Sequence, residues 1–106
     1  MTDSNWQTRA AEFAQKRNLH RTPGVYALDL MSELGEVAKE LLIASAYGTK
    51  EPEYDANLAG ELGDVLYSLC LLATAVNIDL EEALTATLQK YETRWQQSSH
   101  LGSQSE

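Results

Sequence analysis

The chain has 106 residues, of which 43% are hydrophobic and 23% are charged, values that suit a single globular domain. Acidic residues outnumber basic ones 16 to 8. The resulting formal charge of −8 argues against a nucleic-acid polymer or an anionic membrane as the main partner, because both require a basic surface. With only two prolines and six glycines, long helices are favoured over a sheet rich in turns.

Cysteine content and apolar patterning predict the compartment. Cys70 is the only cysteine, so no internal disulfide can form, and its apolar neighbours predict a small buried core residue. The polar stretch over residues 1–15 lacks the apolar region of a signal peptide, and no apolar stretch reaches the roughly 18 residues that a membrane span needs. We therefore expect a protein of the reducing cytoplasm.

The first half of the chain is predicted to form two helices. One spans about residues 5–19, and its apolar stripe comprises Trp6, Ala10, Phe13 and Ala14. Thr22 and Pro23 are typical of a helix start, with threonine as N-cap and proline at the first helical position. The second helix therefore runs over about residues 23–46. Its apolar face comprises Leu30, Leu34, Val37 and Leu41.

The second half is predicted to form two more helices. The third spans about residues 53–76, and its apolar stripe comprises Leu58, Leu62, Val65, Leu69, Leu72 and Val76. Asp79 followed by Glu82 is a capping-box pattern, which predicts that the fourth helix begins at Leu80 and continues to about residue 97. Its inward-facing residues are expected to be Leu80, Leu84, Leu88, Tyr91 and Trp95.

These elements predict the domain organisation. Residues 1–97 are expected to form a single helical domain, and the polar residues 98–106 a disordered tail. Four helices with short connections pack most simply as an antiparallel four-helix bundle, so the fold class is predicted to be all-α. A lone domain of this size buries only about two thirds of its unfolded surface, and assembly into a dimer or larger oligomer would add stability.

Two pairs of acidic residues are the main candidates for a functional site. Glu33 and Glu36 stand three residues apart in the second helix, and Glu61 and Asp64 do so in the third. This spacing places the members of each pair side by side on a helix face. Apolar residues flank both pairs, so we expect the acids to border a helix–helix interface. An acidic surface exposed to water is the simpler interpretation of one pair alone, and the second matching pair weakens it.

The surroundings of the acidic pairs favour a bound cation. Gly35 and Gly63 each lie within a pair, where a mid-helix glycine costs about 1 kcal/mol relative to alanine. Close approach of another helix or a ligand would explain this choice. Clustered, half-buried carboxylates repel one another, and a divalent cation removes the repulsion. Oxygen ligands suit a hard ion, Mg²⁺ or Mn²⁺.

The two acidic motifs resemble those of a known family. Glu33–Glu36 and Glu61–Asp64 are similar to the paired ExxE and ExxD signature of the MazG-like all-α nucleoside triphosphate pyrophosphohydrolases. Trp6–Glu40 is similar to the N-terminal half of the small dCTP-pyrophosphatase branch. Asn77–Leu84 and Lys90–Trp95 resemble the last helix of the family. The resemblance covers about residues 6–95.

The resemblance implies a fold, an activity and a cofactor. It implies a helical homodimer or dimer of dimers in which Glu33, Glu36, Glu61 and Asp64 hold Mg²⁺. It implies hydrolysis between the α- and β-phosphates of a nucleoside triphosphate, with dCTP or another deoxynucleotide as candidate substrate and cleansing of the nucleotide pool as the role. The metal would neutralise the triphosphate and activate the attacking water. Glu36 is our candidate for the general base.

Five further residues are candidates for substrate binding. His20 and Arg21 precede the first acidic helix and are candidates for phosphate or base contacts, or else form a solvated connection. Trp6 is a candidate for stacking on the nucleobase, although aromatic residues at helical spacing more often pack in a core. Lys90 and Arg94 would reach phosphates, or else interact favourably with the C-terminal end of their helix.

Some observations leave alternatives open. Many family members carry a second glutamate directly before the first motif, where this chain has Ser32. Many also carry an asparagine in the last helix, where this chain has Leu88, whose place in the apolar stripe indicates packing. A di-iron bundle is disfavoured because neither histidine lies three residues after a glutamate. A non-catalytic helical interaction module with a relict metal site is the remaining alternative.

Overall fold

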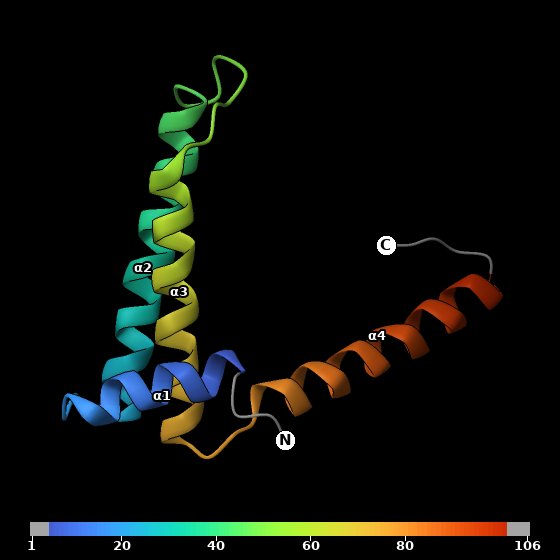
Figure 1. Cartoon of the computed structure of the whole chain (residues 1–106). Coiled ribbons are helices and arrows are strands. Elements are labelled where there is room, and N and C mark those ends of the chain that lie inside the picture. The colour runs from blue at the N-terminus through green and yellow to red at the C-terminus, as the bar shows by residue number, and fades with distance from the viewer. Residues whose placement is uncertain (1–4, 102–106) are drawn as a thin grey trace.

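The computed structural model describes residues 5–101, and the side chains of residues 5–98. Over this range the chain forms four α-helices and no β-strand, which confirms the predicted all-α class (Figure 1). The helices are α1 (Trp6–Lys16), α2 (Pro23–Ala44), α3 (Ala56–Ala75) and α4 (Leu80–Leu101).

Local hydrogen bonds explain where the helices begin. The Asn5 side chain accepts a hydrogen bond from the Thr8 amide at 2.7 Å and caps α1. The Asp79 side chain accepts one from the Glu82 amide at 3.0 Å, as the capping pattern predicted for α4. Helix α2 begins at Pro23 as predicted, although the Thr22 side chain makes no capping hydrogen bond. The starts of α1, α2 and α4 therefore follow local features of the sequence.

The connection between α2 and α3 is longer than expected at both ends. Helix α2 ends at Ala44 and α3 begins at Ala56, where Asp55 caps it by accepting a hydrogen bond from the Asn57 amide at 2.9 Å. Ala46 and Tyr47 have φ angles of 49° and 60°, followed by Gly48 at 86°. Three successive left-handed residues reverse the chain direction, and only the glycine adopts this conformation without strain.

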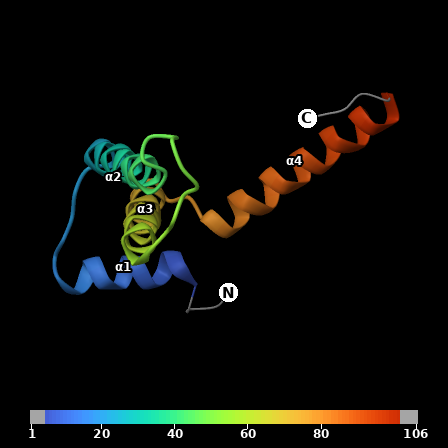
Figure 2. The ribbon, with the colours of Figure 1, turned by 90° about the horizontal axis from the view of Figure 1, so that it is seen from above.

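Helix α3 is the centre of a three-helix body. Helices α2 and α3 lie side by side, and α1 crosses α3 on the side away from α2 (Figures 1 and 2). The buried core joins one residue from each helix, Ala14, Tyr26 and Leu71. Ala10, Tyr67 and Leu72 pack against it. The body thus brings α2 beside the face of α3 that carries the second acidic pair.

Tyr26 fixes the connection between α1 and α2. Its hydroxyl donates a hydrogen bond to the Leu19 carbonyl oxygen at 3.3 Å and accepts one from the Arg21 amide at 3.1 Å. The ring is 7% exposed. A buried tyrosine whose hydroxyl is satisfied in this way holds the connection against the body.

The predicted four-helix bundle is wrong for a single chain. Helix α4 leaves the body and extends away from it as an arm (Figures 1 and 2). It also continues to Leu101, so the predicted start of the tail at residue 98 falls within the helix. The prediction for residues 102–106 lies outside the described residues. Helical periodicity shows that α4 has an apolar face, but it does not say which chain covers that face.

Most of the predicted apolar stripes remain exposed within one chain. Among the described residues, the buried apolar ones are Ala14, Tyr26, Cys70, Leu71 and Ala73. Burial of Cys70 confirms its predicted core position and raises the pKa of its thiol. Several residues expected to be buried are exposed instead: Leu34, Leu41, Leu62, Leu69, Val76, Leu84, Leu88, Tyr91 and Trp95. The predicted packing of Leu88 is therefore not found in the single chain.

By length and composition alone, α3 is apolar enough to cross a membrane, with a mean hydropathy of 1.4, contrary to the expectation from the sequence. The core helix of a compact protein meets the same criterion. Helix α3 packs against α1 and α2 and carries Glu61 and Asp64, and such carboxylates are expensive in hydrocarbon. Its apolar character therefore fits a central helix of the body.

Candidate metal centre

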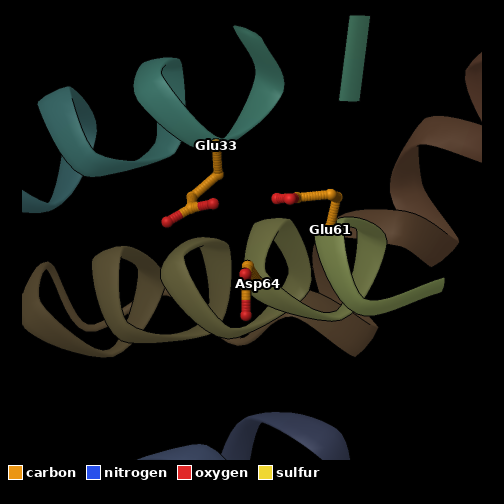
Figure 3. A group of neighbouring side chains, drawn as sticks. All are labelled: Glu33, Glu61 and Asp64. Carbon is orange, nitrogen blue, oxygen red and sulfur yellow. The ribbon is translucent and has the colours of Figure 1, made fainter. Parts of the chain in front are cut away.

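Three carboxylates converge between α2 and α3. Oxygen atoms of Glu33, Glu61 and Asp64, one from each residue, all lie within 4.8 Å of one another. Figure 3 shows Glu33 reaching from α2 and Glu61 from α3 into the space between the helices, with Asp64 about one turn along α3. The spacing within α3 places Glu61 and Asp64 on one face, and packing of α2 beside it adds Glu33.

The negative charges of this cluster are uncompensated. The pKa of Glu61 is raised above its ordinary value of 4.5, first by partial loss of hydration and then by the nearby charge of Glu36. The charges of Asp64, Glu33 and Glu40 raise it further. Within residues 5–98, no lysine or arginine forms an ion pair or hydrogen bond with Glu33, Glu61 or Asp64. The described side chains of a single chain therefore supply no cation to this site.

The donor set fits a hard divalent cation. All three groups offer carboxylate oxygen, the ligand type that Mg²⁺ and Mn²⁺ prefer. Around one Mg²⁺, adjacent oxygens are about 3 Å apart and opposite oxygens about 4.2 Å. The three donor oxygens lie within 4.8 Å of one another, so rotamer changes that bring them closer would let them share one ion. A cation would also remove the repulsion that raises the pKa of Glu61.

Glu36 lies beside the cluster rather than within it. It is exposed on α2 and is absent from the three converging donors, although the sequence placed it among four ligands. Its charge is nevertheless the strongest electrostatic influence on Glu61. A carboxylate near the donors that is not one of them is suited to accept a proton.

The predicted role of the two motif glycines is not found in the single chain. A Cβ atom built at Gly35 or at Gly63 would meet nothing within 4 Å. No helix of the described chain therefore approaches them closely. The space beside both glycines is open to a ligand or to another molecule.

Trp6 lines a shallow cavity of about 610 Å³ between α1 and α3. Phe13 and Tyr67 contribute further aromatic surface, with their ring centroids 6.0 Å apart in an edge-to-face arrangement. Arg9 brings a positive charge, and Gly63, next to Asp64 in the sequence, forms part of the wall. The sequence made Trp6 a candidate for base stacking but did not bring Arg9 or Tyr67 to it, because no local pattern indicates which face of α3 meets α1.

His20 and Arg21 lie at the start of α2, away from the cluster. At 1.5 Å per residue, Glu33 stands about 16 Å along the helix from Thr22. The Arg21 guanidinium donates a hydrogen bond to the His20 carbonyl oxygen at 3.0 Å. The single chain therefore does not bring these two residues to the carboxylates.

Lys90 and Arg94 lie on the α4 arm, away from the carboxylates of the same chain (Figure 1). The Lys90 ammonium and the Arg94 guanidinium each lie 5.7 Å from the centre of the Tyr91 ring. This arrangement gathers two positive charges on one short stretch of the arm. Contact with the carboxylates of the body would require a second chain.

Comparison with known proteins identifies the family. Residues 21–98 match the MazG nucleotide pyrophosphohydrolase domain. The chain belongs to this family. The MazG match covers α2, α3 and most of α4, including all four motif carboxylates, and it confirms the resemblance of the two motifs. MazG proteins are generally metal-dependent, and nucleotide pyrophosphohydrolase is the activity for which the domain is named.

A relative of this MazG chain is the uncharacterized protein YpjD of Bacillus subtilis (strain 168). The two are 41% identical over 68 residues, which cover 61% of this chain and 60% of YpjD. No solved structure matches the chain. The MazG match begins at residue 21, so α1, which supplies half of the residues that line the aromatic cavity, lies outside it.

Proposed function

We propose that the chain is a Mg²⁺-dependent nucleoside triphosphate pyrophosphohydrolase that releases a nucleoside monophosphate and pyrophosphate. The convergence of Glu33, Glu61 and Asp64 on a site to which residues 5–98 contribute no cation carries this proposal. A triphosphate brings further negative charge to an already acidic protein, so binding requires a cation between the two. Mn²⁺ would fit the same donors.

The four motif carboxylates have two roles in this proposal, binding of the ion and acceptance of a proton. Glu33, Glu61 and Asp64 hold the cation, which when bound neutralises phosphate charge and makes water a better nucleophile. Glu36, beside the donors but outside them, accepts the proton from the water that attacks the α-phosphorus.

The aromatic cavity is our candidate for the nucleobase site. Trp6, Phe13 and Tyr67 offer flat apolar surface for stacking, and Arg9 offers a positive charge. Gly63 in the wall of this cavity is next to Asp64 in the sequence, but the cavity lies between α1 and α3 and the carboxylates converge between α2 and α3. The phosphates of a nucleotide bound in the cavity would therefore have to extend past α3 to reach the cation. We propose a deoxynucleotide such as dCTP as substrate and removal of surplus or noncanonical nucleotides from the cytoplasmic pool as the role.

We propose that the protein works as a homodimer or homotetramer. The exposed apolar residues of α4 have no partner helix within the described chain, and one of them, Trp95, is 62% exposed. A second copy would bury this stripe. The same contact would bring Lys90 and Arg94 of one copy toward the phosphates held by the other.

Pyrophosphate release across ribo- and deoxynucleoside triphosphates tests the function. We expect release with Mg²⁺ for at least one nucleotide, and its loss in Glu36→Gln and in Asp64→Asn. Glu12→Gln is the matched control, because Glu12 is exposed on α1 and lies outside the cluster. Release that survives both motif substitutions contradicts the mechanism. No release from any nucleotide favours the non-catalytic interaction module.

A further inference from the structure

One side chain connects three parts of the molecule where the arm leaves the body. The Gln7 amide nitrogen, on α1, donates a hydrogen bond to the Thr74 hydroxyl in the last turn of α3 at 3.2 Å. The same nitrogen donates to the Ile78 carbonyl oxygen in the following connection at 2.7 Å. The Gln7 amide oxygen accepts a hydrogen bond from the backbone amide of Leu80, the first residue of α4, at 2.8 Å.

We propose that Gln7 is a positioning residue that fixes the direction in which α4 leaves the body. The connection from α3 to α4 is short, and Asn77 reverses it with a left-handed φ of 60°. Beyond its first turns α4 extends away from the body, so its direction is set at this end (Figure 1). Gln7 bonds to the elements on both sides of Asn77 and holds their relative orientation.

The three hydrogen-bond partners of the Gln7 side chain require an amide. Thr74 and Ile78 present acceptor oxygens and Leu80 presents a donor, so the side chain must donate and accept at once. Glutamate in place of Gln7 would keep the acceptor for Leu80 and set a carboxylate against the Ile78 carbonyl oxygen. Methionine would keep the length of the side chain and remove both functions.

The hydrogen bond of Gln7 differs from that of the helix cap. Asp79 accepts from Glu82 within the same helix start, so this bond moves with α4 whatever direction it takes. The bond from Leu80 to Gln7 crosses to another helix, so it holds only when α4 has one direction. Substitution of Gln7 therefore tests what sets the direction of the arm, and substitution of Asp79 tests what stabilises its helical start.

The direction of α4 also shapes a groove beside Gln7. A cavity of about 460 Å³ lies between the start of α1, α3 and the start of α4, with Leu69 and Leu84 in its wall. If α4 took another direction at Asn77, the shape of this groove and the position of the apolar stripe of the arm would both change. The consequence for assembly rests on the proposed oligomer, whereas the positioning of α4 by Gln7 does not.

Amide hydrogen exchange of the full chain tests the hydrogen bond directly. We expect exchange at Leu80 to become about 5- to 10-fold faster in Gln7→Met, the loss of about one net hydrogen bond, while exchange at Glu82 is unchanged. Asp79→Ala should give the reverse pattern. Gln15→Ala is the matched control, since this exposed glutamine of the same helix makes no side-chain hydrogen bond among the described residues. Unchanged Leu80 exchange in Gln7→Met overturns the proposal.

Distance measurement tests the positioning itself. Spin labels at exposed positions 39 on α2 and 89 on α4, in a Cys70→Ala background diluted with unlabelled chain, report the angle of the arm. We expect a narrow distribution in the parent and in Gln15→Ala, and a distribution at least twofold broader in Gln7→Met. Gln7→Glu should broaden it less, because Leu80 keeps its acceptor. A narrow, unshifted distribution in both Gln7 variants overturns the proposal, whether or not the protein hydrolyses nucleotides.

Discussion

The three-helix body and the α4 arm carry similar apolar stripes but differ in what covers them. In the body, α1, α2 and α3 share a core of Ala14, Tyr26 and Leu71, and their packing also gathers the acidic residues. In the arm, the stripe meets no other helix along most of its length (Figure 2). Helical periodicity thus shows that a face will be buried, whereas the identity of its partner depends on contacts that periodicity does not encode.

The two regions also carry different charged candidates for the site. The acidic cluster lies in the body, whereas Lys90 and Arg94 lie near the middle of α4, which extends away from the body (Figure 1). Chemistry is therefore expected to depend first on the body and assembly first on the arm. Substitutions confined to one region test whether this division holds.

The largest effect is expected for a metal donor of the body. Glu61→Gln should lower pyrophosphate release by at least about 100-fold at fixed Mg²⁺, because it removes a charged ligand from a site where three carboxylates converge. The oligomeric mass, measured by light scattering, should stay unchanged. Activity that falls equally in Glu12→Gln would contradict a local role for the cluster.

A double substitution in the arm should have the next largest effect. Leu84→Asp with Leu88→Asp should raise the dissociation constant of the oligomer by about 100-fold or more, because burial of each leucine contributes about 1.5–3 kcal/mol. Sedimentation at several concentrations measures this change. Thr85→Asp with Gln89→Asp, on an exposed part of the same helix, controls for added charge. An unchanged dissociation constant would place the interface elsewhere.

Local chemistry explains what the sequence could predict of the fold. The start of α2 at Pro23 and that of α4 at Leu80 depend on neighbouring residues and were predicted correctly. The class and number of helices follow from the same short-range patterns. The bundle was wrong for the single chain because the direction of α4 depends on contacts between distant residues, such as Gln7 with Leu80, which are 73 positions apart.

The candidate site, like the fold, was predicted only in its local features. Spacing alone placed Glu61 and Asp64 together, and the packing of α2 against α3 brought Glu33 to them. The structure leaves Glu36 outside the three donors, and no helix of the described chain approaches Gly35, so a ligand or a second chain is the remaining explanation for this glycine. These details depend on how two helices rotate about their axes, which is a tertiary property.

Magnesium should stabilise the body and leave the arm unchanged. At ten times its dissociation constant the ion should add about 1.4 kcal/mol to the free energy of unfolding, which raises the melting temperature by roughly 5–10 °C. Calorimetry with and without Mg²⁺ measures this shift, and Glu61→Gln should abolish it. Hydrogen exchange should slow in α2 and α3 around the cluster, and equal slowing along α4 would show that the two regions are not independent.

The smallest effect is expected in the pH dependence of the metal-free protein. The raised pKa of Glu61 means that the folded state keeps this proton to higher pH than the unfolded state. Above pH 4.5 the folded state therefore binds more protons than the unfolded state does. The free energy of unfolding consequently falls as the pH rises from 4.5 toward the raised pKa of Glu61.

Glu61→Gln removes this penalty, so in the presence of a chelator it should be more stable than the parent at neutral pH and lose that advantage toward pH 4.5. Urea midpoints across this range measure the difference, and Glu12→Gln should show no such trend. Adding Mg²⁺ should reverse the order at neutral pH, because the ion stabilises the charged cluster only where Glu61 is present. If the stability difference between the parent and Glu61→Gln did not change with pH, repulsion among these carboxylates would not destabilise the metal-free protein.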